Sequence, residues 1–248
     1  MLRLATLVCL AAAVAPATAA AQQRPPLGAR LASCATGAAA RERTAAFTAS
    51  MPAVDGGARM WMRFDLLQRM PGEAEFAPVQ LPAWGRWERA EPGRTGFIYT
   101  KRVQALRAPG AYRAHVRFRW YAPDGRLLRR ARRLTPICRQ PDPRPDLRAG
   151  ALTRAGGLGP EAATYLLTVQ NTGRGAAGPF DVVLTTTGMP QPPVRVDGLA
   201  AGESRVVGLP GPACAPGSTV RFVLDAGAAV AESDEADDVV DRPCPVAG

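Results

Sequence analysis

Six carboxylate side chains lie within ten residues near the C-terminal end of the sequence. Carboxylate oxygens are the hard ligands that Ca²⁺ prefers, so this acidic run is a candidate calcium site. Its spacing differs from that of an EF-hand loop, which requires a central Gly and a terminal bidentate Glu. A turn with solvated charges is the structural alternative. The calcium candidates are Glu232, Asp234, Glu235, Asp237 and Asp238.

Arginine side chains dominate a second stretch. Residues 112–120 alternate between apolar and polar side chains, the pattern of a half-buried β-strand. Ala122-Pro123-Asp124-Gly125 has the residues of a hairpin turn, so residues 126–135 are expected to return as the neighbouring strand. In the strand at 112–120, the arginines are expected on the same face as His115. The candidate residues of this hairpin are Arg113, Arg117, Arg119, Arg126, Arg129, Arg130, Arg132 and Arg133.

These arginines are a candidate surface for a polyanion. Facing side chains of neighbouring strands lie about 5 Å apart, and like charges at that distance repel. A bound acidic surface polymer, nucleic acid or phospholipid relieves the repulsion. Aromatic stacking is expected from Trp61, Trp84, Trp87 and Tyr99.

Three structural alternatives to polyanion binding remain open. The chain has one Lys among 31 basic residues, which indicates an arginine-favouring, GC-rich genome. Arginine stems can also cover apolar surface while their charged ends stay in water. Finally, the arginines can dock onto the acidic second half of the chain.

Residues with catalytic potential are few. The sole histidine, His115, lies in mid-strand among arginines, with no Ser or Cys nucleophile near it in the sequence. No phosphate-binding loop or dinucleotide fingerprint occurs, and the glycine-rich residues 156–160 join two predicted strands instead of opening a helix. We therefore expect no enzymatic activity, and no cofactor other than the Ca²⁺ considered above.

The N-terminal residues have the pattern of a secretory signal. Arg3 is followed by an apolar segment, residues 4–14, which is too short to span a bilayer. Small residues suited to cleavage follow at residues 17–21. Residues 1–21 are thus predicted to be a signal peptide, and the mature protein to be secreted or associated with the cell envelope, without a membrane span.

Removal of that signal leaves four cysteines. An even number in an exported chain predicts disulfides, and four cysteines allow three pairings. A four-thiolate metal site is disfavoured, because no close Cys-x-x-Cys pair occurs. The positions favour Cys34 with Cys138 and Cys214 with Cys244, so that each bridge closes one domain.

Charge divides the chain into two halves. Residues 24–144 carry 22 Arg and one Lys against nine acids, a net charge of +14. Residues 145–248 carry seven Arg against twelve acids, a net charge of −5. Such asymmetry indicates two domains. The predicted division is a flexible lead at 22–30, an Arg-rich domain at 31–139, a Pro-rich linker at 140–145 and a second domain at 146–244.

Both predicted domains consist of short strands separated by turn signals. This pattern, without helical periodicity, predicts an all-β protein of two β-sandwiches. In the first domain, Leu106, Tyr112 and Val116 have a spacing similar to the tyrosine corner of immunoglobulin-like domains, with Ala114 where their cysteine lies. The strands of the second domain are expected near residues 147–154, 164–170, 180–187, 194–196, 203–209, 220–225 and 239–242.

The second domain carries a more specific set of motifs. It opens with Pro145-Asp146-Leu147 and continues with Tyr165-x3-Val169-x-Asn171-x-Gly173. Residues 176–180 read Ala-Ala-Gly-Pro-Phe, residues 196–204 read Val-x-Gly-Leu-Ala-Ala-Gly-Glu-Ser, and the acidic run closes the series. Over residues 145–241 this pattern resembles CARDB, the cell-adhesion-related domain found in bacteria.

The resemblance implies an immunoglobulin-like fold in a secreted bacterial protein, but no established ligand. CARDB sequences usually have Asn at the positions of Asp234, Asp237 and Asp238, which favours a turn-capping role for these residues. We therefore expect a secreted, non-catalytic interaction or adhesion protein whose partner is an extracellular protein or envelope polymer. The alternatives are a polyanion-binding protein that acts through the hairpin at 113–133, and a Ca²⁺-stabilised spacer.

Overall fold

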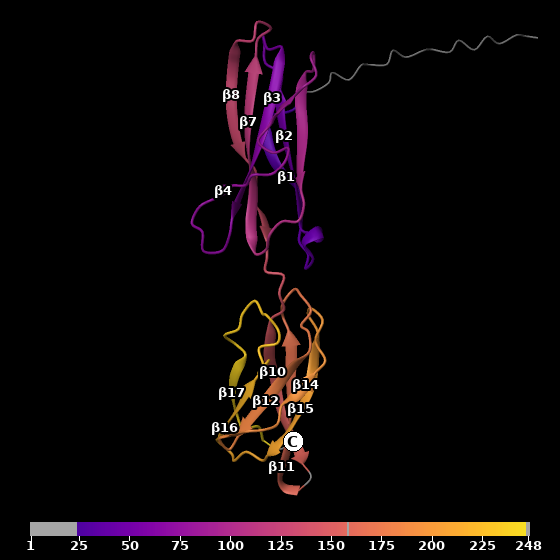
Figure 1. Ribbon diagram of the computed structural model, residues 1–248, viewed down its shortest axis with the longest axis vertical. Helices are drawn as coiled ribbons and strands as arrows, with labels where there is room; N and C mark the ends of the chain where they lie inside the picture. The colour runs from indigo at the N-terminus through magenta and orange to yellow at the C-terminus, as the bar shows by residue number, and fades with distance from the viewer. Residues whose placement is uncertain (1–23, 158, 247–248) are drawn as a thin grey trace, which may run out of the picture.

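The computed structural model of this 248-residue chain describes residues 24–157 and 159–246. The predicted signal peptide, residues 1–21, lies outside the described residues. Figure 1 shows two groups of strands, one after the other along the long axis of the molecule, joined by a short stretch of chain. The first group contains β1 to β9 and the second contains β10 to β17.

The first group forms two antiparallel sheets that pack face to face. One sheet has the strand order β1-β2-β6, and the other has the order β4-β3-β7-β8, with β5 pairing β3 and β9 pairing β7. A short 3₁₀-helix, Ala40–Glu42, connects β1 to β2. The strands are β1 (Gly28–Ala35), β2 (Thr44–Pro52), β3 (Arg59–Arg69), β4 (Ala77–Pro78), β5 (Trp87–Arg89), β6 (Gly96–Val103), β7 (Gly110–Tyr121), β8 (Leu127–Leu134) and β9 (Cys138–Gln140).

Period-two alternation builds the core of this first sandwich. From Tyr112 to Tyr121 on β7 the even-numbered residues are buried and the odd-numbered ones are half-buried, and most of β3 shows the same alternation. Successive residues of a strand point to opposite faces, so each strand gives one apolar face to the core. The largest fully buried side chains include Trp120, Phe118, Phe64 and Phe47.

Two features of immunoglobulin-like domains occur in this sandwich. The hydroxyl of Tyr112 donates a hydrogen bond to the carbonyl of Arg107 at 2.9 Å, which is the contact of a tyrosine corner. Burial raises the pKa of the Tyr112 phenol. Ala114 is fully buried at the position of the immunoglobulin cysteine, and the disulfide of this domain instead joins Cys34 to Cys138.

The second group also forms two antiparallel sheets. One has the order β10-β11-β15, and the other has the order β13-β12-β16-β17, with β14 pairing β12. β10 ends at Gly157 and β11 begins at Gly159, so the glycine-rich stretch lies between two strands as predicted. The strands are β10 (Leu147–Gly157), β11 (Gly159–Asn171), β12 (Phe180–Thr186), β13 (Met189–Pro190), β14 (Val194–Val196), β15 (Ser204–Pro212), β16 (Thr219–Val223) and β17 (Val239–Pro243).

Buried apolar side chains fall into two separate clusters. One lies within residues 45–138 and the other within residues 147–230. No α-helix occurs in the described ranges, and more than half of the chain is strand. The protein is therefore all-β with two sandwiches, which confirms the predicted fold class. The residue bounds of the two domains remain a prediction.

Two boundary expectations need correction. Residues 28–30, expected in a flexible lead, pair with residues 48–50 as the start of β1, because Leu27, Ala29 and Leu31 pack against the core. Gln140, expected in the linker, belongs to β9 and is 2 % exposed. Its amide nitrogen donates a hydrogen bond to the carbonyl of Ala35 at 3.1 Å, which ties it to the first sandwich.

The proline-rich stretch that follows is packed against the second sandwich. The backbone N–H groups of Thr172 and Arg174 donate to the carbonyls of Asp146 and Arg144, at 2.7 and 3.1 Å. A Cβ atom added at Gly173 would lie 2.6 Å from the Arg144 oxygen. The loop after β11 therefore approaches the linker so closely that it requires glycine.

No helix in the described parts of the chain has the length and apolar character to cross a membrane.

Candidate functional site

Four arginines come together on the solvent side of the β7–β8 hairpin. Arg117 pairs directly with Arg132, and Arg119 pairs with Arg130. Directly paired residues of antiparallel strands share one face of the sheet, about 5 Å apart. We call these four residues the arginine face.

One carboxylate lies among these charges. Asp65, on the neighbouring strand β3, accepts a hydrogen bond from Arg117 at 2.7 Å and forms an ion pair with Arg63 at 3.0 Å. Within the described ranges, Arg119, Arg130 and Arg132 form no ion pair. The arginine face therefore keeps a strong excess of positive charge.

The arginine face borders a hollow of about 560 Å³. The ring of Trp87, from β5, forms part of its wall, and the guanidinium carbon of Arg119 lies 4.4 Å from the centre of that ring. A guanidinium stacked on an aromatic ring keeps its N–H edges free to donate. This arrangement offers an anion several charged donors beside an apolar ring.

His115 lies at the edge of the same hollow. Desolvation, followed by the charge of Arg117, lowers the pKa of its imidazole below the usual value of 6.5, although Asp65 acts in the opposite direction. Its surroundings therefore favour the neutral imidazole over the charged form.

The other four predicted arginines are not part of this group, although Arg113 lies on the same face of β7. Arg113 stacks on Phe76, with its guanidinium carbon 4.1 Å from the ring centre. Arg126 follows the hairpin turn and contacts Asp124. Arg129 and Arg133 belong to the opposite face of β8, where they pair with Trp120 and Val116. Of the eight candidates, the structure brings four together as the arginine face, and their binding of a polyanion stays a prediction.

The expected stacking residues also divide between the two faces. Trp61 and Trp87 lie 6.4 Å apart, and Trp61 also contacts Tyr121 on the solvent side of the sheet. Trp84 and Tyr99 instead pack on the core residue Phe64, at 6.4 and 6.2 Å. Trp84 and Tyr99 are thus unavailable to a ligand on the arginine face.

Three of the five calcium candidates converge in the loop between β16 and β17. Carboxylate oxygens of Glu232, Glu235 and Asp238 all lie within 4.8 Å of one another, and we call these residues the acidic cluster. One oxygen of the fully buried Glu232 accepts the backbone N–H of Leu147. Burial raises the pKa of Glu232 to about 8 and that of Asp238 to about 6, and the neighbouring carboxylates add to both shifts.

The other two calcium candidates have separate roles. Asp234 accepts the backbone N–H of Ala236 at 3.0 Å, the turn-capping contact that the resemblance implied. Asp237 forms an ion pair with Arg148 at 3.1 Å. Asp225, which the acidic run in the sequence did not include, also lies near the cluster, since its charge raises the pKa of Glu232. It lies two residues after the end of β16, at the start of the same loop.

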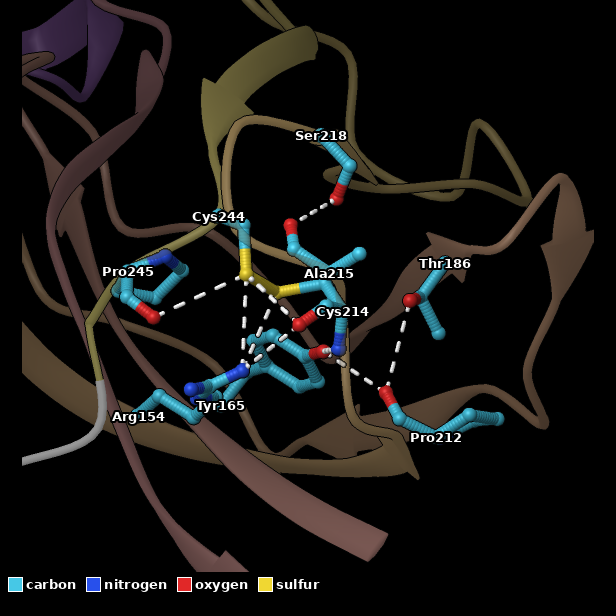
Figure 2. The surroundings of a disulfide bond; sticks show 9 residues. All are labelled: Arg154, Tyr165, Thr186, Pro212, Cys214, Ala215, Ser218, Cys244 and Pro245. Carbon is cyan, nitrogen blue, oxygen red and sulfur yellow. Dashed lines mark hydrogen bonds between the residues drawn. A yellow bond between two sulfur atoms is a disulfide. The ribbon is translucent and has the colours of Figure 1, made fainter. Parts of the chain in front are cut away.

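Both predicted disulfides are present. Cys34 and Cys138 have Cα atoms 5.5 Å apart, and those of Cys214 and Cys244 are 5.8 Å apart. Figure 2 shows the second bridge, with the guanidinium of Arg154 beside the sulfur atoms and the carbonyl of Cys214. Arg154 donates to that carbonyl at 2.9 Å. The bridge fastens the C-terminal end of β17 to the loop after β15.

A buried asparagine organises the end of the second sandwich next to the linker. Asn171 is fully buried, and its side-chain oxygen accepts the N–H groups of Asp146 and Gly173 at 3.1 and 3.0 Å. Its side-chain nitrogen donates to carbonyls of the loops after β11 and β14, including Gly175 at 2.8 Å and Leu199 at 3.1 Å. The Asn171-x-Gly173 motif thus joins three segments of backbone.

Comparisons with known proteins agree with the motifs of the second half. Residues 144–242 match the model of the CARDB family, whereas the N-terminal part matches no family model. No curated protein matches the chain.

Fold comparison found many solved structures, and two of them come from fimbrial systems. One is a chaperone–tip adhesin complex described as vital for synergistic activation of CFA/I fimbriae biogenesis, at 12 % identity and a TM-score of 0.27, covering 89 % of this chain and all of the other. The other is the class 5 fimbriae chaperone CfaA, at 13 % identity and a TM-score of 0.26, covering 87 % of this chain and 98 % of the other. We draw nothing from TM-scores this low. The family match concerns one part of the molecule: residues 144–242 are similar to the CARDB family.

Proposed function

We propose that this protein is a secreted, non-catalytic interaction protein of a bacterial cell envelope, and that its arginine face binds an anionic polymer. The observation that carries the proposal is the set of Arg119, Arg130 and Arg132, which form no ion pair in the described structure although they lie on adjacent strands. Two disulfides and a CARDB domain support the extracellular location.

Electrostatics favours an anion as the partner of the first sandwich. Two directly opposed arginine pairs destabilise a sheet unless counter-charges neutralise them. Asp65 already serves Arg63 and Arg117, so it leaves the other three guanidiniums to solvent or to a ligand. A polymer with regularly spaced acidic groups would engage several of them at once, and each guanidinium can donate two hydrogen bonds to one carboxylate or phosphate.

The non-catalytic part of the proposal rests on the chemistry near the hollow. His115 is the histidine of the site, and the hollow is otherwise lined by guanidiniums, the indole of Trp87 and apolar side chains. The carboxylate opposite His115, Asp65, is held by Arg63 and Arg117. The hollow is open to solvent beside charged donors, which suits a polymer more than a small enclosed substrate. The CARDB domain supports the adhesion role, with a protein partner as the second candidate.

The test is binding of the mature protein to heparin-like polyanions and acidic envelope polymers at about 50 and 200 mM salt. We expect binding that weakens with salt, by roughly one unit of log K per log unit of salt for each contact. The double change Arg130→Ser and Arg132→Ser should weaken binding about tenfold or more at the lower salt. It should also reduce the slope of log K against log salt by about two, one for each lost contact.

A matched control lies on the same strand. Arg129→Ser with Arg133→Ser removes the same charge from β8, but from the opposite face. We expect its binding to stay within about threefold of the unmodified protein, with thermal unfolding as a check of folding for both pairs. Equal loss in the two pairs would mean that net charge alone drives binding. Absence of binding at either salt would reject the polyanion and leave a protein partner for the CARDB domain.

A further inference from the structure

The acidic cluster contains oxygen atoms that have no partner. Glu232 is completely buried, and while one of its oxygens accepts the N–H of Leu147, Oε1 has no hydrogen-bond partner. Oδ1 of Asp238 is also buried without a partner. Buried carboxylate oxygens are normally paired, because an unpaired buried charge is strongly unfavourable. The carboxyl groups of Glu232 and Asp238 lie close enough to hydrogen-bond to each other, so the two atoms share either a proton or a bound cation.

Turn formation does not account for these atoms. Turn contacts in the loop use other oxygens: Asp225 accepts the N–H groups of Ala229 and Val230 at 3.0 and 2.7 Å, and Asp234 accepts that of Ala236. Within the cluster, Oε1 of Glu235 accepts the N–H of Glu232 at 2.7 Å, but this contact leaves Oε1 of Glu232 and Oδ1 of Asp238 unused. Solvation does not account for them either, because Glu232 has no exposed surface. In the described part of the chain, no basic side chain forms an ion pair with Glu232, Glu235 or Asp238, although Arg148 pairs with Asp237 in the same loop.

We propose that Glu232, Glu235 and Asp238 bind one Ca²⁺ ion. Ca²⁺ binds six to eight oxygens at about 2.3–2.6 Å, so two oxygens on one ion lie no more than about 5 Å apart. The carboxylate oxygens of the cluster lie within 4.8 Å of one another, which fits this limit. Mg²⁺ requires shorter bonds of about 2.0–2.1 Å in strict octahedral geometry, and is the poorer fit. Water would complete the coordination of Ca²⁺.

The ion would act on the connection between the two sandwiches. Glu232 accepts the N–H of Leu147, the first residue of β10, and the N–H of Ser233 donates to the carbonyl of Pro145 at 2.8 Å. A cation held by Glu232 therefore fixes the loop that contacts the end of the proline-rich stretch. Ca²⁺ at extracellular concentration would then stiffen the end of the second sandwich that adjoins the proline-rich stretch.

The experiment uses the mature protein, stripped with EDTA and then titrated with CaCl₂ at pH 7.5 by calorimetry and thermal unfolding. Extracellular calcium modules bind with Kd of about 10⁻⁴–10⁻³ M, so 10 mM CaCl₂ should raise Tm by about 5–20 °C. Glu232→Gln keeps a hydrogen-bond acceptor but removes the charge, and should weaken Ca²⁺ binding at least about tenfold while the metal-free protein stays folded. If that variant does not fold, Asp238→Asn serves the same purpose.

Asp234→Asn is the matched control, because it removes one charge from the same loop outside the cluster. Its calcium affinity should stay within about threefold of the unmodified protein. An equal loss of affinity in the control would overturn the proposal and indicate diffuse electrostatic attraction. The proposal would also be overturned if neither Tm nor the calorimetric heat responded to 10 mM CaCl₂. Polyanion binding by the same variants is expected to be unchanged, so this test and that of the arginine face can fail separately.

Discussion

The close approach of the loop after β11 to the linker leads to a sharp mutational prediction. Gly173→Ala would place a Cβ atom 2.5 Å from the nitrogen of Asp146 and 2.6 Å from the carbonyl oxygen of Arg144, and nearer still to the carbonyl carbon of Pro145. All three are backbone atoms, which cannot rotate away as a side chain would. The loop and the linker must therefore separate by roughly 1 Å to restore ordinary van der Waals contact.

The size of the effect follows from the contacts that this separation disturbs. Overpacking with a backbone shift typically costs about 1–3 kcal/mol. The hydrogen bonds from Thr172 to Asp146 and from Arg174 to Arg144 would also weaken, and each such bond is worth about 1 kcal/mol. We expect a loss of about 3 kcal/mol in unfolding free energy for the second sandwich. For a domain of about 100 residues this corresponds to roughly 12–24 °C in Tm.

Calorimetry of the whole mature protein, together with tryptophan fluorescence, measures this loss. All four Trp residues lie between positions 61 and 120, so fluorescence reports the first sandwich alone. Gly173→Ala should lower the Tm of the second sandwich, which calorimetry detects and tryptophan fluorescence does not. The Tm measured by fluorescence, which belongs to the first sandwich, should not change. Gly178→Ala, in the same loop with no atom within 4 Å of the added Cβ, should change stability by no more than about 0.5 kcal/mol. Equal Tm values for the two variants would refute the reasoning.

Two further predictions concern His115 and Asn171. The pKa of His115 is lowered in the folded protein, so the unfolded chain binds a proton more readily as the pH falls through 6.5. The contribution of the neutral ring to stability is therefore present above pH 6.5 and is lost below it. NMR of this single histidine should show a titration midpoint under 6.5 that rises when a polyanion binds, and a midpoint unmoved by the polymer would contradict binding near Arg117. Asn171→Ala leaves several buried backbone groups unpaired and should destabilise the second sandwich by about 3–5 kcal/mol in urea unfolding, whereas a loss below about 1 kcal/mol would show that these hydrogen bonds are replaced.

Much of the fold was predictable from local sequence. Strict alternation at 112–120 determined which residues of β7 enter the core, and the same rule applied to β3. The positions of four cysteines favoured one pairing out of three, and that pairing is the one found. The CARDB motifs placed Asn171 and Gly173 together, since side-chain capping and close backbone approach require these residue types.

The acidic run shows where local sequence was insufficient. Five carboxylates were equivalent as candidates, but which ones converge depends on how the loop crosses the start of β10. The N–H of Leu147 draws Glu232 inward, whereas Arg148 draws Asp237 away from the cluster. Both contacts join residues more than 80 positions apart, and periodicity within the loop carries no information about them.

The arginine face was decided by a single backbone irregularity. Tyr121 pairs with Leu127, but Trp120 pairs with Arg129, so Leu128 is an extra residue on β8. Without this bulge the register would place Arg129 opposite Arg119 and turn Arg130 toward the other side of the sheet. The sequence alone determined that β7 presents basic residues on one face; only the tertiary structure decided which arginines of β8 join them. The physical reason is that side chains alternate with a period of two, so one inserted residue exchanges the faces of every residue that follows.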